Sequence, residues 1–290
     1  MLKIGVNTPL LKESIAEIGI YETMRKVADM GYHYIEISQI GLTPENVKEF
    51  KRAQDDFGIQ VCAVSVDVEP QPLGPDGVRK MNVRDDLEQI VEACNTLGCK
   101  HCRTFCIGTE DFSSEENIKA YAARMDEASK RLAAAGLDYS YHPHNYEYAK
   151  HNGKVGMRIL KDASTELKFE LCTYWIQAGG LDSERLIREF GADGRISILH
   201  LKDFRGGKVD WDMFTPENRA KLNGNPLINL IEFAEAGEGN LDIPGIISAG
   251  DDVGAEYIFL EQDQHYGRSE FEILQTDYDN LCAMGYKDRM

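Results

Sequence analysis

The sequence predicts an α/β protein that folds as a single (β/α)8 TIM barrel over residues 1–290. Three observations support this prediction. Short β-branched segments alternate with longer segments of helical periodicity, and eight of the short segments can be counted along the chain. The first of them is followed by Asn7-Thr8-Pro9-Leu10, which lacks the glycine-rich phosphate loop typical of a doubly wound open sheet. A closed barrel therefore explains the pattern better than an open sheet.

The eight predicted strands are short and rich in β-branched and aromatic residues. They are Lys3–Asn7, Tyr34–Ile37, Gln60–Val66, His101–Cys106, Leu137–His142, Leu167–Cys172, Arg195–Leu201 and Glu256–Glu261. The clearest helix between them begins near Ser113, which we expect to cap it, with Glu116 completing a capping box. A glycine marks several junctions between a helix and the next strand, at Gly31, Gly58, Gly98 and Gly136.

Residues 203–242 form the longest irregular segment of the chain. Long loops in compact domains usually have a function, so we expect an active-site loop here with short helical pieces of its own.

Charge and cysteine content exclude several classes of function. The chain has 49 acidic against 32 basic side chains, a net charge of −17, which disfavours binding to nucleic acid or to an anionic membrane. The seven cysteines are an odd number in a chain too large to need disulfides. The N-terminus resembles no signal peptide, and no apolar segment is long enough for a transmembrane helix. We therefore expect a soluble cytoplasmic protein; a homo-oligomer stays open.

Candidate metal ligands stand at the ends of the last four predicted strands. They are His142, Cys172, His200 and Glu261. In a barrel these carboxyl ends meet at one mouth, and strand alternation places Ile198 and His200 on one face. A single histidine is more often a structural residue of the core. Four potential ligands at matching strand ends instead favour a shared metal site.

Five motifs in order resemble the xylose isomerase-like barrel superfamily, often called sugar phosphate isomerases/epimerases. They are Tyr141-His142-Pro143-His144-Asn145-Tyr146-Glu147-Tyr148, Tyr174-Trp175-Ile176-Gln177-Ala178-Gly179-Gly180, His200-Leu201-Lys202-Asp203, Gly237-Glu238-Gly239-Asn240-Leu241-Asp242 and Leu260-Glu261-Gln262-Asp263. The resemblance covers essentially the whole chain. It implies one divalent ion, held by His142, Cys172, His200 and Glu261.

Two of these positions depart from the family pattern. Ketose 3-epimerases of the superfamily have glutamate where this chain has His142, and a histidine there is more similar to the inosose dehydratase branch. Cys172 stands where the pattern Asp-Thr-Tyr-Trp has aspartate. A thiolate suits Zn²⁺ but is a poor ligand for Mg²⁺ or Mn²⁺, so Cys172 either shifts the site toward zinc or weakens it. We expect Zn²⁺ or Mn²⁺, with Mg²⁺ and Co²⁺ as alternatives.

The resemblance implies an isomerase or epimerase of a sugar, a sugar phosphate or a related polyhydroxy carbonyl compound. Glu261 would be the general base, assisted by His142, and Lys202 would stabilise the enediolate. The expected substrate-binding residues are His144, Trp175, Asp203 and Arg205. The alternatives are a dehydratase of the inosose dehydratase type and a metal-free, non-catalytic binding subunit. The partner is a small carbohydrate, with no nucleic acid and no membrane.

Overall fold

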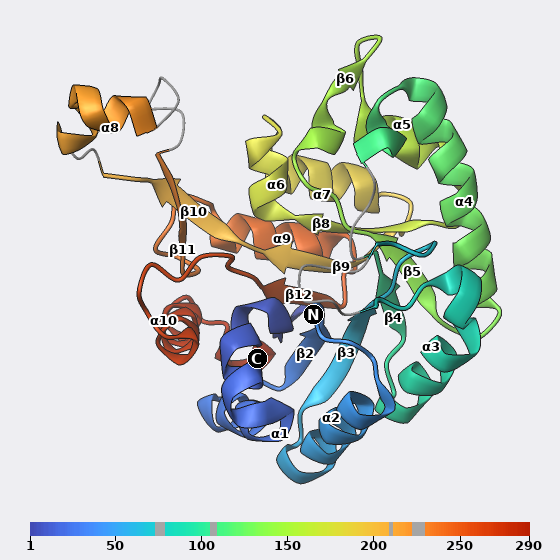
Figure 1. The fold of residues 1–290 in the computed structure, drawn as a ribbon, viewed down its shortest axis with the longest axis horizontal. Coiled ribbons are helices and arrows are strands. Elements are labelled where there is room, and N and C mark those ends of the chain that lie inside the picture. The colour runs from blue at the N-terminus through green and yellow to red at the C-terminus, as the bar shows by residue number, and fades with distance from the viewer. Residues whose placement is uncertain (73–78, 105–108, 209–210, 222–229) are drawn as a thin grey trace.

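The computed structural model describes residues 1–72, 79–104, 109–208, 211–221 and 230–290. Its centre is a closed parallel barrel of eight strands in the order β1-β12-β9-β8-β5-β4-β3-β2 (Figure 1). The strands are β1 (Lys3–Asn7), β2 (Tyr34–Ile37), β3 (Gln60–Ser65), β4 (His101–Arg103), β5 (Asp138–Tyr141), β8 (Lys168–Cys172), β9 (Ile196–Leu201) and β12 (Tyr257–Leu260). The predicted fold class is therefore confirmed.

Helices surround the barrel and pack their apolar stripes against the outer faces of the strands. They are α1 (Lys12–Met30), α2 (Pro44–Phe57), α3 (Val83–Leu97), α4 (Glu115–Ala133), α5 (Gly156–Ala163), α6 (Thr173–Ala178), α7 (Ser183–Gly191), α9 (Ile243–Asp252) and α10 (Glu270–Ala283). Short 3-10 turns are η1 (Thr8–Leu11), η2 (Thr109–Phe112), η3 (Tyr146–Tyr148) and η5 (Lys287–Arg289).

The predicted boundaries shift by one or two residues at several strands. The strand predicted to begin at Leu137 spans Asp138–Tyr141, and the one predicted over Glu256–Glu261 spans Tyr257–Leu260. The prediction for β4 ran to Cys106, and residues 105–108 lie outside the described residues. The cap of α4 is Ser114, not Ser113, because the Ser114 side chain accepts the N–H of Asn117.

The predicted junction glycines adopt the backbone conformation that their role requires. Gly58 and Gly98, which end α2 and α3, have φ angles of 70° and 68°. This left-handed region costs glycine nothing because it has no Cβ atom.

Residues 203–242 contain more regular structure than predicted. Antiparallel strands β10 (Asp203–Gly206) and β11 (Ile231–Ala234) form a ribbon. Between them in the chain come η4 (Trp211–Phe214) and α8 (Pro216–Lys221), which project away from the barrel (Figure 1). A second hairpin, β6 (Lys150–His151) with β7 (Lys154–Val155), follows β5.

The barrel interior changes from apolar to charged toward the mouth. A buried cluster of Cys62, Ala63, Ile198, Tyr257 and Phe259 fills its lower part. Glu36, Arg103 and His200, all buried, lie toward the ends of β2, β4 and β9, and on β9 His200 comes two residues after Ile198. The apolar layer thus supports a layer of ionisable side chains at the carboxyl ends of the strands.

Candidate metal centre at the barrel mouth

Three predicted ligands meet at the mouth. One donor atom from each of His142, His200 and Glu261 lies within 4.8 Å of the others. His142 directly follows β5, His200 lies near the end of β9, and Glu261 directly follows β12. His142 and His200 are buried, and the Glu261 side chain is 10% exposed. Two imidazoles and a carboxylate are a suitable set of donors for Zn²⁺ or Mn²⁺.

A second group of possible ligands lies beneath this one and shares His200. It consists of Glu36, Glu170 and His200, all fully buried. Arg103 lies 2.7 Å from Glu36 and 3.2 Å from Glu170, so a guanidinium already supplies positive charge to both carboxylates. This arrangement favours the upper group, His142, His200 and Glu261, as the place for a metal ion.

His200 connects the two groups through its two ring nitrogens. Its Nδ1 atom lies 3.1 Å from Oε2 of Glu261, and its Nε2 atom lies 3.2 Å from carboxylate oxygens of Glu36 and Glu170. Burial opposes the charged form of His200. The surrounding carboxylates, Glu170 first, outweigh burial and hold the pKa of the imidazole well above its usual value. Positive charge, from a proton or from a cation, is therefore stabilised at this position.

His142 has the opposite electrostatic character. Burial, followed by the nearby His200, holds the pKa of His142 well below its usual value, so the ring is neutral and a competent metal ligand. Its Nδ1 atom lies 3.3 Å from Oε2 of Glu170, yet neither atom makes a hydrogen bond to a described group. The Nδ1 atom of His142, buried and without a hydrogen bond to a described group, therefore fits a site that accepts a cation or a polar ligand.

Cys172 lies at the edge of the upper group. Its Sγ atom is buried and lies 3.7 Å from Oε2 of Glu261, to which the thiol donates a hydrogen bond. Burial raises the pKa of the Cys172 thiol. Cys172 therefore stands beside the three convergent donors, but as a thiol it would have to lose a proton to bind a metal.

Lys202 is buried at the mouth. Its Nζ atom lies 2.6 Å from Asp263 and 3.5 Å from Glu261. Burial opposes its charge, but the Glu261 carboxylate outweighs burial and raises the pKa of Lys202. Lys202 is therefore a fixed cation and hydrogen-bond donor, and its amine is not free to act as a nucleophile.

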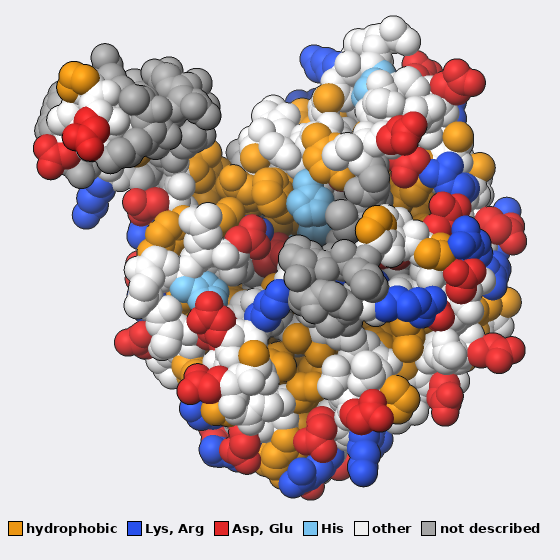
Figure 2. Space-filling view, in the orientation of Figure 1, with side chains coloured by type: hydrophobic (Ala, Val, Ile, Leu, Met, Phe, Trp, Pro, Cys, Tyr) orange, Lys and Arg blue, Asp and Glu red, His pale blue; other side chains and the backbone are white. Residues whose placement is uncertain are grey.

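Aromatic rings line one side of the mouth. The Nζ atom of Lys202 lies 4.8 to 5.7 Å from the ring centroids of Tyr174, Trp175 and Phe233. The centroids of His144 and Trp175 are 5.1 Å apart. Figure 2 shows a histidine at this hollow next to a group of hydrophobic side chains. Rings of this kind can stack on the apolar face of a sugar.

Asp203 and Arg205, predicted to bind substrate, both make contacts within the protein. The Asp203 carboxylate accepts backbone hydrogen bonds from Phe204, Gly237, Gly239 and Leu241. It therefore holds the loop after β11. Arg205 lies on the ribbon, with Nε 3.4 Å from Glu232 and Nη1 3.8 Å from the Glu238 carboxylate.

The site also contains residues whose signals in the sequence are weaker. Glu36, Arg103 and Glu170 were not among the predicted site residues, although they surround His200 and His142. Glu36 is a charged residue inside the otherwise apolar run Tyr34–Ile37, and Glu170 shares a strand face with Cys172. Both signals are visible in the sequence, but each is common among ordinary strands.

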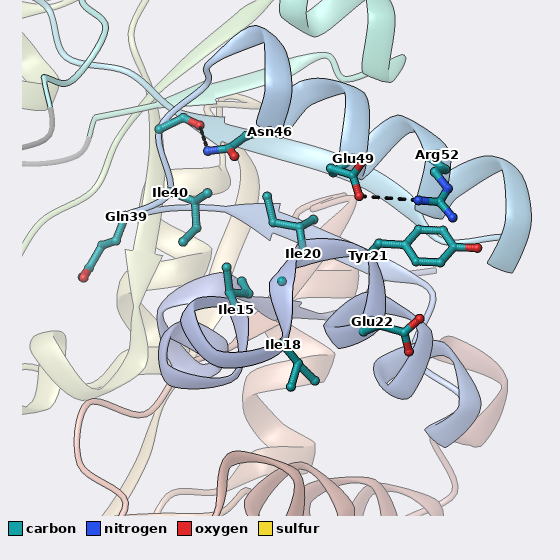
Figure 3. A pocket seen from close by; sticks show the side chains of 12 residues that line it. Ile15, Ile18, Ile20, Tyr21, Glu22, Gln39, Ile40, Asn46, Glu49 and Arg52 are labelled. Atoms are coloured by element: carbon teal, nitrogen blue, oxygen red, sulfur yellow. Dashed lines mark hydrogen bonds and ion pairs between the residues drawn. The ribbon is translucent and has the colours of Figure 1, made fainter.

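A separate cavity of about 700 Å³ lies outside the barrel, beside a kink of α1 at Gly19 (Figure 3). Its lining contains Ile15, Ile18 and Ile40, together with Glu49 and Arg52, which lie 3.8 Å apart. Among the described residues, no group of convergent metal-binding side chains lies in this lining.

Comparison with known proteins agrees with the barrel fold. No curated protein sequence matches the chain. A sugar phosphate isomerase/epimerase from Parabacteroides distasonis superimposes with a TM-score of 0.72 at 18% identity, over 99% of this chain and 96% of that one. The probable 3-DHS dehydratase AsbF from Bacillus anthracis gives 0.64 at 17% identity, over 97% and 99%.

A third structure, the IOLI protein with a bound zinc atom, has a TM-score of 0.65 at 16% identity and covers 100% of this chain and 99% of that one.

In the described part of the chain, none of the helices is both long and apolar enough to cross a membrane. The family model of the xylose isomerase-like TIM barrel matches residues 24–279. The chain therefore belongs to the xylose isomerase-like TIM barrel family.

Proposed function

We propose that the protein is a divalent-metal-dependent isomerase or epimerase of a sugar or related polyhydroxy carbonyl compound. The observation that supports this most directly is the convergence of His142, His200 and Glu261 within 4.8 Å at the mouth. These three residues would hold the ion, with Cys172 as a candidate fourth ligand. A bound divalent ion would polarise the substrate carbonyl and make the neighbouring C–H more acidic.

The side chains around this group suit proton transfer. Burial disfavours the carboxylate of Glu261, but Lys202 and His200 outweigh it and keep the pKa of Glu261 well below its usual value. Glu261 is therefore ionised and able to accept a proton. Lys202 keeps its charge and can donate a hydrogen bond to the oxygen on which negative charge develops. His144 and Trp175 can position the sugar.

The proposal is tested in two steps. Metal-stripped protein is first titrated with Zn²⁺ and Mn²⁺ by calorimetry, and we expect one tight site per chain. The loaded protein is then incubated with candidate ketoses and aldoses in D₂O. Proton abstraction next to the carbonyl incorporates solvent deuterium at that carbon, which NMR detects. A protein that binds no divalent ion, or that binds one but exchanges no carbon-bound proton, refutes the proposal.

A dehydratase is the second candidate, and His142 is the observation that favours it. A neutral histidine replaces the second carboxylate that the resemblance to ketose 3-epimerases would require. The same proton abstraction would then be followed by loss of water. Mass spectrometry separates the two reactions, because only dehydration gives a product lighter than the substrate by one water molecule.

A further inference from the structure

The cations within the barrel mouth are already matched by carboxylates. Arg103 pairs with Glu36 and Glu170, and Lys202 with Glu261 and Asp263. With His200 neutral as a metal ligand, two cations face four carboxylates, an excess of two negative charges that a divalent ion would neutralise. A phosphate dianion bound beside this group would restore a negative excess in a site shielded from water.

The cations on the outer rim are paired in the same way. Arg205 lies beside Glu232 and Glu238, and Arg268 beside Glu235. Before α3, Arg79 pairs with Asp86, and on α4, Arg124 pairs with Asp111. The sequence of the four segments outside the described residues, 73–78, 105–108, 209–210 and 222–229, contains no lysine, arginine or histidine. To bind a phosphate, any of these four arginines would have to leave its carboxylate partner.

The other side of the mouth has the character of a neutral sugar site. Trp175 lies between His144 and Tyr174, with ring centroids 5.1 and 4.6 Å apart, and the Tyr174 ring lies 4.8 Å from Phe233. Such a surface binds the C–H face of an uncharged ring. The hydrogen-bonding groups above the apolar layer of the barrel can bind the hydroxyl groups of that sugar ring.

We propose that the substrate is an uncharged sugar or cyclic polyol, and not a phosphate ester. This inference rests on the proposed function, because it names the substrate class of the same site. It predicts that Asp263 prevents Lys202 from binding an anion, since Asp263 is the closest carboxylate to Nζ at 2.6 Å.

The test measures the binding of inorganic phosphate to metal-stripped protein by calorimetry at low ionic strength. We expect no detectable binding to the wild type at 10 mM phosphate, because a dissociation constant on the order of 10 mM is the weakest that calorimetry detects. Asp263→Asn should bind phosphate at least about tenfold more tightly than wild type. Asp55→Asn is the matched control, because Asp55 pairs with Lys51 on the outer helix α2 and its loss should change nothing.

Metal-loaded protein is then offered matched pairs, D-fructose with D-fructose 6-phosphate and D-xylulose with D-xylulose 5-phosphate. Tighter binding of the free sugar supports the inference. Three results would overturn the inference. They are a dissociation constant of the wild type for phosphate below about 1 mM, an Asp263→Asn variant that behaves like Asp55→Asn, and tighter binding of either phosphate ester than of its free sugar. A protein that binds no divalent ion refutes the proposed function instead, so the two failures are distinguishable.

Discussion

The Nε2 atom of His200 lies 3.2 Å from both carboxylate oxygens of Glu36, on the opposite side of the ring from Glu261. Arg103 donates to the same Glu36 carboxylate, so Glu36 is held from two sides. A carboxylate behind a histidine ligand fixes the tautomer and the orientation of the ring. Glu36 therefore leaves Nδ1 of His200 as the nitrogen that faces Glu261.

Replacing Glu36 tests this relationship. Glu36→Gln should weaken the binding of Zn²⁺ or Mn²⁺ about 10- to 100-fold, because the imidazole loses the negative charge of the carboxylate that orients it. Calorimetric titration of the metal-stripped variant measures the change. Glu189→Gln is the matched control, because it breaks an Arg–Glu pair, with Arg158, on helices outside the barrel. Equal metal affinities in the two variants would show that Glu36 has no role in the metal centre.

Glu261→Gln should abolish turnover and deuterium exchange without unfolding the protein. The substitution keeps the shape of a side chain that is 10% exposed at the mouth, and it removes the carboxylate that accepts the proton. Activity and thermal melting are measured together. His200→Ala, by contrast, should also lower the melting temperature, because it leaves Glu36 and Glu170 buried with less positive charge nearby. A Glu261→Gln protein that is inactive and unfolded would contradict the assignment.

The barrel and the convergence of three ligands could be predicted because both follow from repetition and strand alternation. In an eight-stranded barrel, the side chains at the carboxyl ends of the strands share one mouth. Alternation then placed His200 on the interior face with Ile198, which the structure bears out.

The depth of each side chain in the barrel could not be predicted in the same way. Glu170 and Cys172 share a strand face, and the sequence favoured Cys172 because it stands at the position of the family aspartate. Which of them lies beside His142 depends on the stagger between neighbouring strands, and that is a property of the closed barrel. The contact of Phe233 with Lys202 could not be predicted either. The two residues are 31 positions apart in the sequence, and the ribbon of β10 and β11 brings them together.

Asp203→Ala should destabilise the protein and change substrate binding little. Asp203 accepts the backbone N–H groups of Phe204, Gly237, Gly239 and Leu241, and loss of the carboxylate leaves four donors without this acceptor. Each such donor costs about 1–3 kcal/mol when buried, so the melting temperature should fall by several degrees. Asp242→Ala removes only a helix cap at α9 and should cost about 1 kcal/mol. An unchanged melting temperature with a raised KM would instead restore Asp203 as a substrate ligand.

Asp277 should make the stability of the protein depend on pH. Burial, with a smaller contribution from Glu235, raises the pKa of Asp277 to about 8. The folded state therefore holds this proton more tightly than the unfolded state, where the pKa is about 4. Stability should fall as pH rises from about 4 to about 8, by on the order of a few kcal/mol. Asp277→Asn keeps an acceptor for the N–H of Ala236 and should flatten the dependence in urea unfolding at pH 5 and 9. Asp279→Asn on the same helix should not.

We expect Cys172 to decide which metal the site prefers. With a thiolate, two imidazoles and one carboxylate, the ligand set is softer than the oxygen-rich set that the family resemblance implies, so zinc should bind more tightly than manganese. Because burial raises the pKa of the Cys172 thiol, zinc binding should release a proton and strengthen as pH rises. Cys172→Asp should raise the affinity for Mn²⁺ about thirtyfold, on the order of 2 kcal/mol. Cys282→Asp, which places the same carboxylate on α10, is the control and should leave Mn²⁺ affinity unchanged. If the wild type binds no divalent ion and Cys172→Asp creates binding, the thiol of Cys172 prevents the wild-type site from binding metal. If the wild type already prefers Mn²⁺ and the substitution changes nothing, Cys172 is not a ligand and His142, His200 and Glu261 form the complete protein contribution.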